Sequence, residues 1–352
     1  MQLAAAFRAF SAPGARAPTM RSNLVVAVHS EAAQVSSGSV PAAGTQQVPG
    51  QLRLKFGVKN IPHPNKAHYG GEDAFFVSEV GGGAAGIADG VGGWAESGIN
   101  PADYSKNFMA TARSYLEDCA SLRPEVMSSG EWHAQQERHQ QAAASSITEA
   151  LSSSEARTAV EALDAAHRAT KLPGSATACV LRLDSHTGEL DAANLGDSGF
   201  LIIRQGRLHF QSPAMQHYFD CPLQFGMPPD TDYAQDAAVF SFKLQPGDVI
   251  VMATDGLLDN MQQEDIVRLA PRSAADVEQA AAALGELASR NAADPEYESP
   301  YTQGALEEGM DIPIWEKLLG AKIKDGRLEL AKLRGGKMDD ITVVCAVVVA
   351  AA

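Results

Sequence analysis

The chain has 352 residues, of which 45% are hydrophobic and 20% are charged, and its formal net charge is −15. This composition is typical of a globular protein, and the sequence has no run of about 18 apolar residues that would predict a membrane span. The acidic balance argues against nucleic-acid binding, which needs a clustered basic face. An anionic substrate would therefore need local positive charge, such as a bound metal ion.

The first fifty residues differ from the rest of the chain. Residues 1–30 contain Arg8, Arg16 and Arg21 but no acidic residue, and they are rich in alanine, serine and proline. This pattern is typical of an organelle transit peptide and lacks the apolar core of a secretory signal. We expect residues 1–50 to be a transit peptide and linker, with a plain tail as the alternative, and residues 51–352 to form one domain.

Short apolar runs and turn residues predict an alternation of strands and helices. The predicted strands cover residues 74–80, 84–88, 176–184, 188–196, 199–205, 207–213, 246–256 and 339–349. The predicted helices cover residues 102–120, 155–171, part of 121–154 and one or two segments within 263–291. The run of strands over 176–213 predicts a meander of hairpins. Antiparallel strands with helices set apart predict an α+β fold, a central antiparallel β-sandwich flanked by helices in four αββα layers.

The four cysteines, Cys119, Cys179, Cys221 and Cys345, are widely spaced. They form no C-x-x-C pair and fit no zinc pattern, so we expect all four to be reduced. Cys179 and Cys345 lie in apolar runs, where small buried thiols are common.

Acidic residues recur at the ends of the predicted strands. They are Glu72 and Asp73, Asp89, Asp197, Asp255, and Asp339 and Asp340. Any single Asp-Gly pair is more often a simple turn. Several such acids together favour a metal site, because close carboxylates stay ionised only beside a cation, and all-oxygen clusters suit Mg²⁺ or Mn²⁺. Two such ions about 4 Å apart can activate a shared water for attack on phosphorus, so the pattern predicts phosphate ester hydrolysis.

Six segments in order carry a family resemblance. They read "GGEDAFF", "IADGVGGW", "GSATACV", "NLGDSG", "VIVMATDGLLDNM" and "KMDDITVV". Together they resemble the metal-dependent type 2C serine/threonine protein phosphatases from about residue 55 to the C-terminus. The resemblance implies that a hydroxide bridging two metal ions, with a weaker third ion nearby, hydrolyses phosphothreonine or phosphoserine.

The same resemblance implies the role of each acid. Asp89 would bridge both ions, with the Gly90 carbonyl on one of them and Asp255 and Asp339 on the other. Glu72 would hold a metal or its water, and Asp197 would help to hold a weaker third ion. Thr254 and Ser175 would support the loops.

The sequence departs from the family pattern at two positions of the site. Val91 stands where many relatives have a histidine that protonates the leaving group. His68 stands where many have a phosphate-binding arginine, and Lys66 is a nearby basic substitute unless it is simply a solvated lysine.

Other residues allow two interpretations. Trp94 would line a substrate groove or pack in the core, and His217 would be a structural histidine rather than an acid. A basic segment before the last strand would be a solvated loop or a patch for substrate or membrane surface. Its basic residues are Lys322, Lys324, Lys332, Arg334 and Lys337.

Three longer stretches resemble the chloroplast members of this group: "IPHPNKAHYGGEDAFFV", "QHYFDCPLQFG", and "YESPY" followed by "GMDIPIWEKLLG". That resemblance implies a stromal enzyme, associated with the thylakoid, whose partners are phosphorylated photosystem II proteins. We expect the chain to be a monomer. Two alternatives stay open: a homologue in the mitochondrion or elsewhere with other substrates, and a catalytically silent module that binds phosphoproteins.

Overall fold

The computed structural model describes residues 51–117, 157–313, 317, 322–324, 327–329 and 331–351. Its strands are β1 (Leu52–Ile61), β2 (Ala74–Ser78), β3 (Ala84–Ala88), β4 (Ala178–Leu183), β5 (Glu189–Leu195), β6 (Gly199–Arg204), β7 (Arg207–Gln211), β8 (Gln216–Tyr218), β9 (Cys221–Pro222), β10 (Ala238–Lys243), β11 (Val249–Ala253), β12 (Lys322–Lys324), β13 (Arg327–Glu329) and β14 (Ile341–Ala350). Its α-helices are α2 (Pro101–Leu116), α4 (Ala159–Ala169), α5 (Asp255–Leu258), α6 (Gln263–Leu269), α7 (Val277–Ala293) and α8 (Pro300–Glu307). Short 3₁₀ helices are η2 (Ala67–Tyr69), η3 (Gly92–Ser97) and η5 (Ala234–Asp236).

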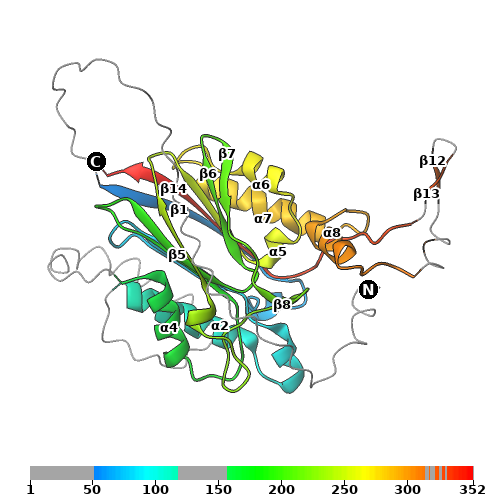
Figure 1. Cartoon of the computed structure of the whole chain (residues 1–352), viewed down its shortest axis with the longest axis horizontal. Coiled ribbons are helices and arrows are strands. Elements are labelled where there is room, and N and C mark those ends of the chain that lie inside the picture. The colour runs from blue at the N-terminus through cyan, green and yellow to red at the C-terminus, as the bar shows by residue number, and fades with distance from the viewer. Residues whose placement is uncertain are drawn as a thin grey trace, which may run out of the picture.

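Two five-stranded antiparallel sheets face each other and carry helices on their outer faces (Figure 1). One sheet has the order β1-β14-β11-β6-β7 and the other β10-β5-β4-β3-β2. Helix α7 packs on the first sheet through β1 and β14, whereas α2 and α4 pack together on the second. The predicted α+β sandwich in four layers is therefore confirmed.

Buried side chains fill the three interfaces between the four layers. Leu181, Phe200 and Val344 belong to the core between the sheets. A second core lies between β2–β5 and the helices α2 and α4, and a third lies between the other sheet and α5–α7. Because apolar side chains cover both faces of the central strands, β11 and most of β14 are buried continuously.

One topological prediction is wrong. The four strands from β4 to β7 do not form a single meander, because the β4–β5 hairpin lies in one sheet and the β6–β7 hairpin lies in the other. The loop between β5 and β6, which carries Asp197, therefore crosses from one sheet to the other. This crossing places "NLGDSG" at an end of the sandwich.

Strands β1, β8, β9, β10, β12 and β13 lie outside the predicted set. Strand β1 pairs with β14 along its whole length, from Leu52 opposite Ala350 to Ile61 opposite Ile341. Its Gly57 permits close packing with α7, since a Cβ there would lie 2.3 Å from the backbone nitrogen of Glu278. The alternation of its apolar residues with Arg53, Lys55, Gly57 and Lys59 is the period-2 pattern of a half-buried strand, so the local signal was present and was overlooked.

Three predictions concern residues that the structure describes only in part or not at all. The transit peptide prediction and the helix within 121–154 lie outside the described residues. Among the described cysteines, Cys179 and Cys345 are buried, and both are free, as is Cys221. No helix within the described part of the chain has the length and apolar character that crossing a membrane requires.

Candidate metal centre

Three loops at one end of the sandwich carry the acids that sequence analysis predicted as catalytic. Asp89 follows β3, Asp255 begins α5 directly after β11, and Asp339 precedes β14. Strands β11 and β14 pair antiparallel, with Ala253 opposite Val343, so the end of β11 meets the start of β14. One oxygen from each of the three acids lies within 4.8 Å of the other two. We refer to Asp89, Asp255 and Asp339 as the three-acid group.

The loop that carries Asp89 is fixed to the start of β4. The Asp89 carbonyl accepts a hydrogen bond from the Thr177 N–H at 3.0 Å, and the Asp89 N–H donates to the Thr177 hydroxyl at 3.3 Å. Two residues along, the Val91 N–H donates to the Ser175 carbonyl at 3.0 Å. These bonds hold the Asp89 backbone, so its side chain is presented from a rigid loop.

The glycines after the acids permit close packing of the loops. A Cβ at Gly256 would lie 1.9 Å from the Asp340 carbonyl oxygen, and a Cβ at Gly90 would lie 2.8 Å from the Glu72 carbonyl oxygen. No side chain fits at such distances. Gly256 thus brings the Asp255 loop against the segment that carries Asp339.

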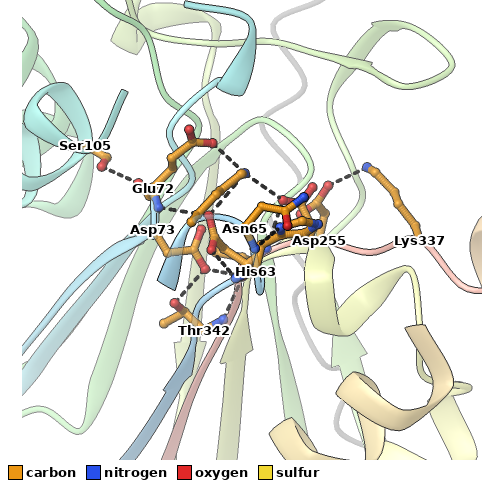
Figure 2. A network of polar contacts seen from close by, with 12 residues as sticks. His63, Asn65, Glu72, Asp73, Ser105, Asp255, Lys337 and Thr342 are labelled. Atoms are coloured by element: carbon orange, nitrogen blue, oxygen red, sulfur yellow. Dashed lines mark hydrogen bonds and ion pairs between the residues drawn. The ribbon is translucent and has the colours of Figure 1, made fainter. Parts of the chain in front are cut away.

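Asp340 and Asp73 hold the loops together. Asp340 is 1% exposed, and its carboxylate accepts hydrogen bonds from the backbone N–H groups of His63 at 2.6 Å and Glu72 at 2.9 Å. Asp73 Oδ2 accepts hydrogen bonds from the hydroxyls of Thr254 at 2.9 Å and Thr342 at 2.6 Å (Figure 2). Both carboxylates therefore connect segments that are far apart in the sequence.

Lys66 approaches the acids from the loop between β1 and β2. Its ammonium lies 2.5 Å from Glu72 Oε2, 3.3 Å from Asp339 Oδ1 and 3.2 Å from Asp340 Oδ2. Burial alone would lower the pKa of Lys66, but Asp339 and the other carboxylates raise it above its usual value. Lys66 is therefore a paired cation beside the three-acid group, and the interpretation as a solvated lysine is wrong.

His68 does not reach the acids. It lies exposed in η2, and its ring contacts the edge of Tyr69 at a centroid distance of 4.7 Å. The Lys66 side chain therefore extends toward the site, and the His68 side chain does not. The Tyr69 hydroxyl donates to Glu72 Oε1 at 3.1 Å, so Glu72 is held by two neighbours of its own loop.

Asp197 and Glu72 lie outside the three-acid group, although both were predicted as metal ligands. Burial, followed by the charge of Asp255, raises the pKa of Asp197 to about 7. This dependence on Asp255 indicates that Asp197 lies near the group. Glu72 is connected to the three-acid group indirectly. Its carboxylate pairs with the Lys66 ammonium, which also pairs with Asp339.

Burial and mutual repulsion act on the three-acid group. Burial, followed by the charge of Asp255, raises the pKa of Asp89 well above its usual range and that of Asp339 to about 6. Burial also acts to raise the pKa of Asp255, but Lys337 beside it brings that pKa below its usual value. A bound divalent cation would stabilise the ionised form of all three carboxylates.

The donor atoms fit such a cation. Asp255 Oδ1 is buried and has no hydrogen-bond partner within the described part of the chain, although Asp255 Oδ2 is paired. A buried carboxylate oxygen without a partner is costly unless a cation binds it. Three carboxylate oxygens from separate loops are the ligands that Mg²⁺ and Mn²⁺ prefer.

The remaining predicted residues lie around this centre. Trp94 is half-buried, and its indole N–H donates to the Ser175 hydroxyl at 2.7 Å, which in turn donates to Gln224 at 2.7 Å. His217 is exposed, and its Nε2 lies 3.0 Å from Asp232, which agrees with a structural histidine. Ser175 and Thr254 join loops, as expected.

The predicted basic segment does not behave as one patch. Arg334 pairs with Glu296 and Glu298 at the surface. Lys337 turns inward to Asp255 instead. Lys332 is exposed, and the side chains of Lys322 and Lys324 lie outside the described structure.

Sequence reasoning missed the inward position of Lys337 and its two further acidic partners, Asp220 and Asp259. The signal that could have found Asp259 is its spacing. It follows Asp255 by four residues, which places both on the same face of one helical turn. No local pattern connects Asp220 with either of them.

Comparisons with known proteins identify the family. The sequence profile described as Stage II sporulation protein E matches residues 136–295. The chain is 37% identical over 299 residues to the Arabidopsis thaliana protein named "Probable protein phosphatase 2C 26", and the match covers 85% of each chain. It is 30% identical over 293 residues to the Homo sapiens "Protein phosphatase PTC7 homolog", covering 80% of each.

Among solved structures, the X-ray structure of the photosystem II phosphatase PBCP is similar, with a TM-score of 0.67 and 36% identity. The match covers 85% of this chain and all of that chain. The chain therefore belongs to the protein phosphatase 2C family and is a serine/threonine protein phosphatase. The predicted family and enzyme class are confirmed.

Proposed function

We propose that the protein removes phosphate from phosphothreonine and phosphoserine in proteins by a metal-dependent reaction at the three-acid group. In this proposal Asp89, Asp255 and Asp339 hold Mg²⁺ or Mn²⁺, with the Gly90 carbonyl as a further ligand. The observation that carries it is the convergence of three carboxylates from separate loops, one with a buried oxygen that lacks a partner. When bound, such ions lower the pKa of a water and neutralise phosphate oxygens.

The chain's own residues have further roles in this proposal. Glu72 lies behind Lys66 and, with Tyr69, holds the lysine side chain over the site. Lys66 supplies a positive charge beside Asp339, where it attracts a phosphate group despite the net charge of −15. Val91 carries no proton to donate, so the leaving group takes its proton from water or from another residue.

We propose photosystem II core proteins at the thylakoid as the substrates. The support is the similarity to the photosystem II phosphatase PBCP and the Arg-containing, acid-free stretch over residues 1–30. A chloroplast transit peptide would place the enzyme in the stroma, where its partners are phosphorylated membrane proteins. A mitochondrial location with other substrates is the alternative.

Hydrolysis of a phosphothreonine peptide tests the chemistry. We expect activity with Mn²⁺ or Mg²⁺, loss of activity with a chelator, and recovery when the metal is restored. Activity that persists at full rate in the chelator would contradict the metal-dependent proposal.

Two experiments test the location and the substrate. Fusion of residues 1–50 to a fluorescent reporter should direct it to the chloroplast, whereas a mitochondrial signal would favour the alternative. Thylakoids that lack this protein should retain more phosphate on photosystem II core proteins, and unchanged phosphorylation would contradict the proposed substrate.

A further inference from the structure

A second group of acids surrounds the ammonium of Lys337 on the outer side of the centre. Lys337 Nζ lies 2.6 Å from Asp255 Oδ2, 3.0 Å from Asp259 Oδ2 and 3.1 Å from Asp220 Oδ1. Figure 2 shows Lys337 reaching Asp255 from the side away from Glu72. One lysine charge is thus shared among three carboxylates from two separate parts of the chain.

The backbone of Lys337 is held in place by a buried side chain. The Lys337 N–H donates to Asn260 Oδ1 at 2.9 Å, and the Lys337 carbonyl accepts from Asn260 Nδ2 at 2.7 Å. Asn260 is 0% exposed and also donates to the Gly256 carbonyl at 2.9 Å. Asn260 therefore fixes Lys337 relative to the turn that carries Asp255 and Asp259.

The residues before Lys337 fix it from the other side. The Gly335 N–H donates to the Tyr297 carbonyl at 2.8 Å, and a Cβ at Gly336 would lie 2.3 Å from the Asn291 carbonyl oxygen. The Tyr301 ring lies 5.2 Å from the Lys337 ammonium, close enough for a cation–π contact. The lysine is thus built into its position and is not a mobile surface side chain.

Asp255 divides its two oxygens between the two groups. Oδ2 pairs with Lys337, whereas Oδ1 is buried and lacks a partner in the described structure. Lys337 thereby determines which oxygen of Asp255 is available to the three-acid group. It also occupies the point to which the carboxylates of Asp259 and Asp220 converge.

We propose that Lys337 is a built-in cation that takes the place of an additional divalent ion on the outer side of Asp255. Its single positive charge offsets part of the negative charge of Asp255, Asp259 and Asp220, and its ammonium confines metal binding to the three-acid group. The inference rests on the proposed metal-dependent function, because Asp255 belongs to both groups. Lys337 acts here as a positioning residue and touches no substrate.

The physical argument is one of space and charge. Three carboxylate oxygens surround the Lys337 ammonium at 2.6–3.1 Å, only slightly farther than the roughly 2.0–2.6 Å at which hard divalent cations take oxygen ligands. An ammonium and a metal ion cannot occupy that point together. Removal of the ammonium would leave three converging carboxylates without a counter-charge, and such a site attracts a divalent ion.

Counting bound Mn²⁺ in the full-length protein tests the inference. The wild-type chain, Lys337→Met and Lys337→Arg are equilibrated with Mn²⁺, and the ions bound per chain are determined by equilibrium dialysis with elemental analysis. We expect Lys337→Met to bind one ion more than the wild type, and Lys337→Arg, which keeps the charge, to match the wild type. The added ion should disappear in the double variant Lys337→Met/Asp259→Asn.

Asp259→Asn in the otherwise wild-type chain gives an independent reading if Lys337→Met does not fold. The inference expects the wild-type number of ions, because Lys337 and not a metal occupies the Asp259 carboxylate. A lower number, or a folded Lys337→Met that gains no ion, would overturn it. Asp89→Asn separates the two proposals, since an unchanged ion count in that variant would contradict the three-acid group itself.

Discussion

Asp73 and Asp89 lie side by side at one end of the β2–β3 hairpin, yet their surroundings differ. Ala74 pairs with Ala88, so the acid before β2 and the acid after β3 are neighbours. Asp73 is 3% exposed, and its Oδ2 accepts hydrogen bonds from two threonine hydroxyls, while its Oδ1 is buried without a partner in the described structure. Asp89 instead lies among other carboxylates, within 4.8 Å of oxygens of Asp255 and Asp339.

This difference separates acids that hold the fold from acids that are available to a ligand. A carboxylate whose partners are hydroxyls and backbone N–H groups stabilises the loops without any added ion. A carboxylate whose neighbours are other carboxylates is destabilising until a cation binds. Substitutions in the two sets should therefore have opposite effects on stability and on metal binding.

The largest effect is expected from Asp89→Asn. Activity toward a phosphothreonine peptide should fall by more than about 100-fold, since even outer-shell partners of metal ligands contribute about 10–100-fold. The free energy of unfolding without metal should be unchanged or higher, because the substitution removes repulsion with Asp255 and Asp339. Steady-state kinetics measure the activity, and urea denaturation in a chelator measures the free energy of unfolding without metal. Glu307→Gln, at an exposed position of α8, is the control, and full activity in Asp89→Asn would contradict the distinction between Asp73 and Asp89.

The second-largest effect is expected from Gly256→Ala. This substitution acts on the packing between the loop of Asp255, which is available to a ligand, and Asp340, which holds the fold. Its added Cβ would lie 1.9 Å from the Asp340 carbonyl oxygen, so the loops must separate. We expect a loss of about 3 kcal/mol in the free energy of unfolding. Gly93→Ala is the matched control, because a Cβ at that exposed glycine meets nothing within 4 Å. Equal stability of the two variants would show that the close approach is not required.

Thr342→Val tests only the acids that hold the fold, because it acts on Asp73. It removes a hydroxyl that donates to Asp73 at 2.6 Å, and hydrogen bonds to charged groups contribute about 1.5–3 kcal/mol. We expect a stability loss of about 2 kcal/mol with Mn²⁺ affinity near that of the wild type. Thr111→Val, whose hydroxyl donates to a carbonyl of its own helix, is the control. If Thr342→Val lost Mn²⁺ binding as Asp89→Asn does, the two sets would not be separate.

The smallest effect is expected from Lys66→Met, because Lys66 contacts both sets through Asp339 and Asp340. Removal of its charge should strengthen Mn²⁺ binding and raise the KM for a phosphopeptide, each by about fivefold, which corresponds to about 1 kcal/mol. Lys55→Met removes a surface pair with Glu79 and serves as the control. A lower Mn²⁺ affinity in Lys66→Met would contradict the expected repulsion between Lys66 and the metal.

Much of the site could be predicted because each acid stands at a recognisable place. Asp89, Asp255 and Asp339 each adjoin an apolar run, and the alternation of such runs also predicted most of the strands. The distinction between Asp73 and Asp89 could not be predicted, since it depends on hydroxyls of Thr254 and Thr342 that lie far away in the sequence.

Lys337 and the change of sheet after β5 escaped prediction for a related reason. A lysine in a basic segment reads as solvated until its acidic partners are known, and Asp220 and Asp255 come from distant loops. The short loop after β5 gives no local indication that β6 joins the other sheet. Both features depend on how the two sheets pack, and local sequence does not record that.

The most direct test of the central claim is anomalous diffraction at the manganese edge from crystals of the protein soaked in Mn²⁺. We expect anomalous density within coordination distance of Asp89, Asp255 and Asp339, and none beside the ammonium of Lys337. Density that lies elsewhere, with the three carboxylates unliganded, would contradict the assignment of these acids as the metal centre.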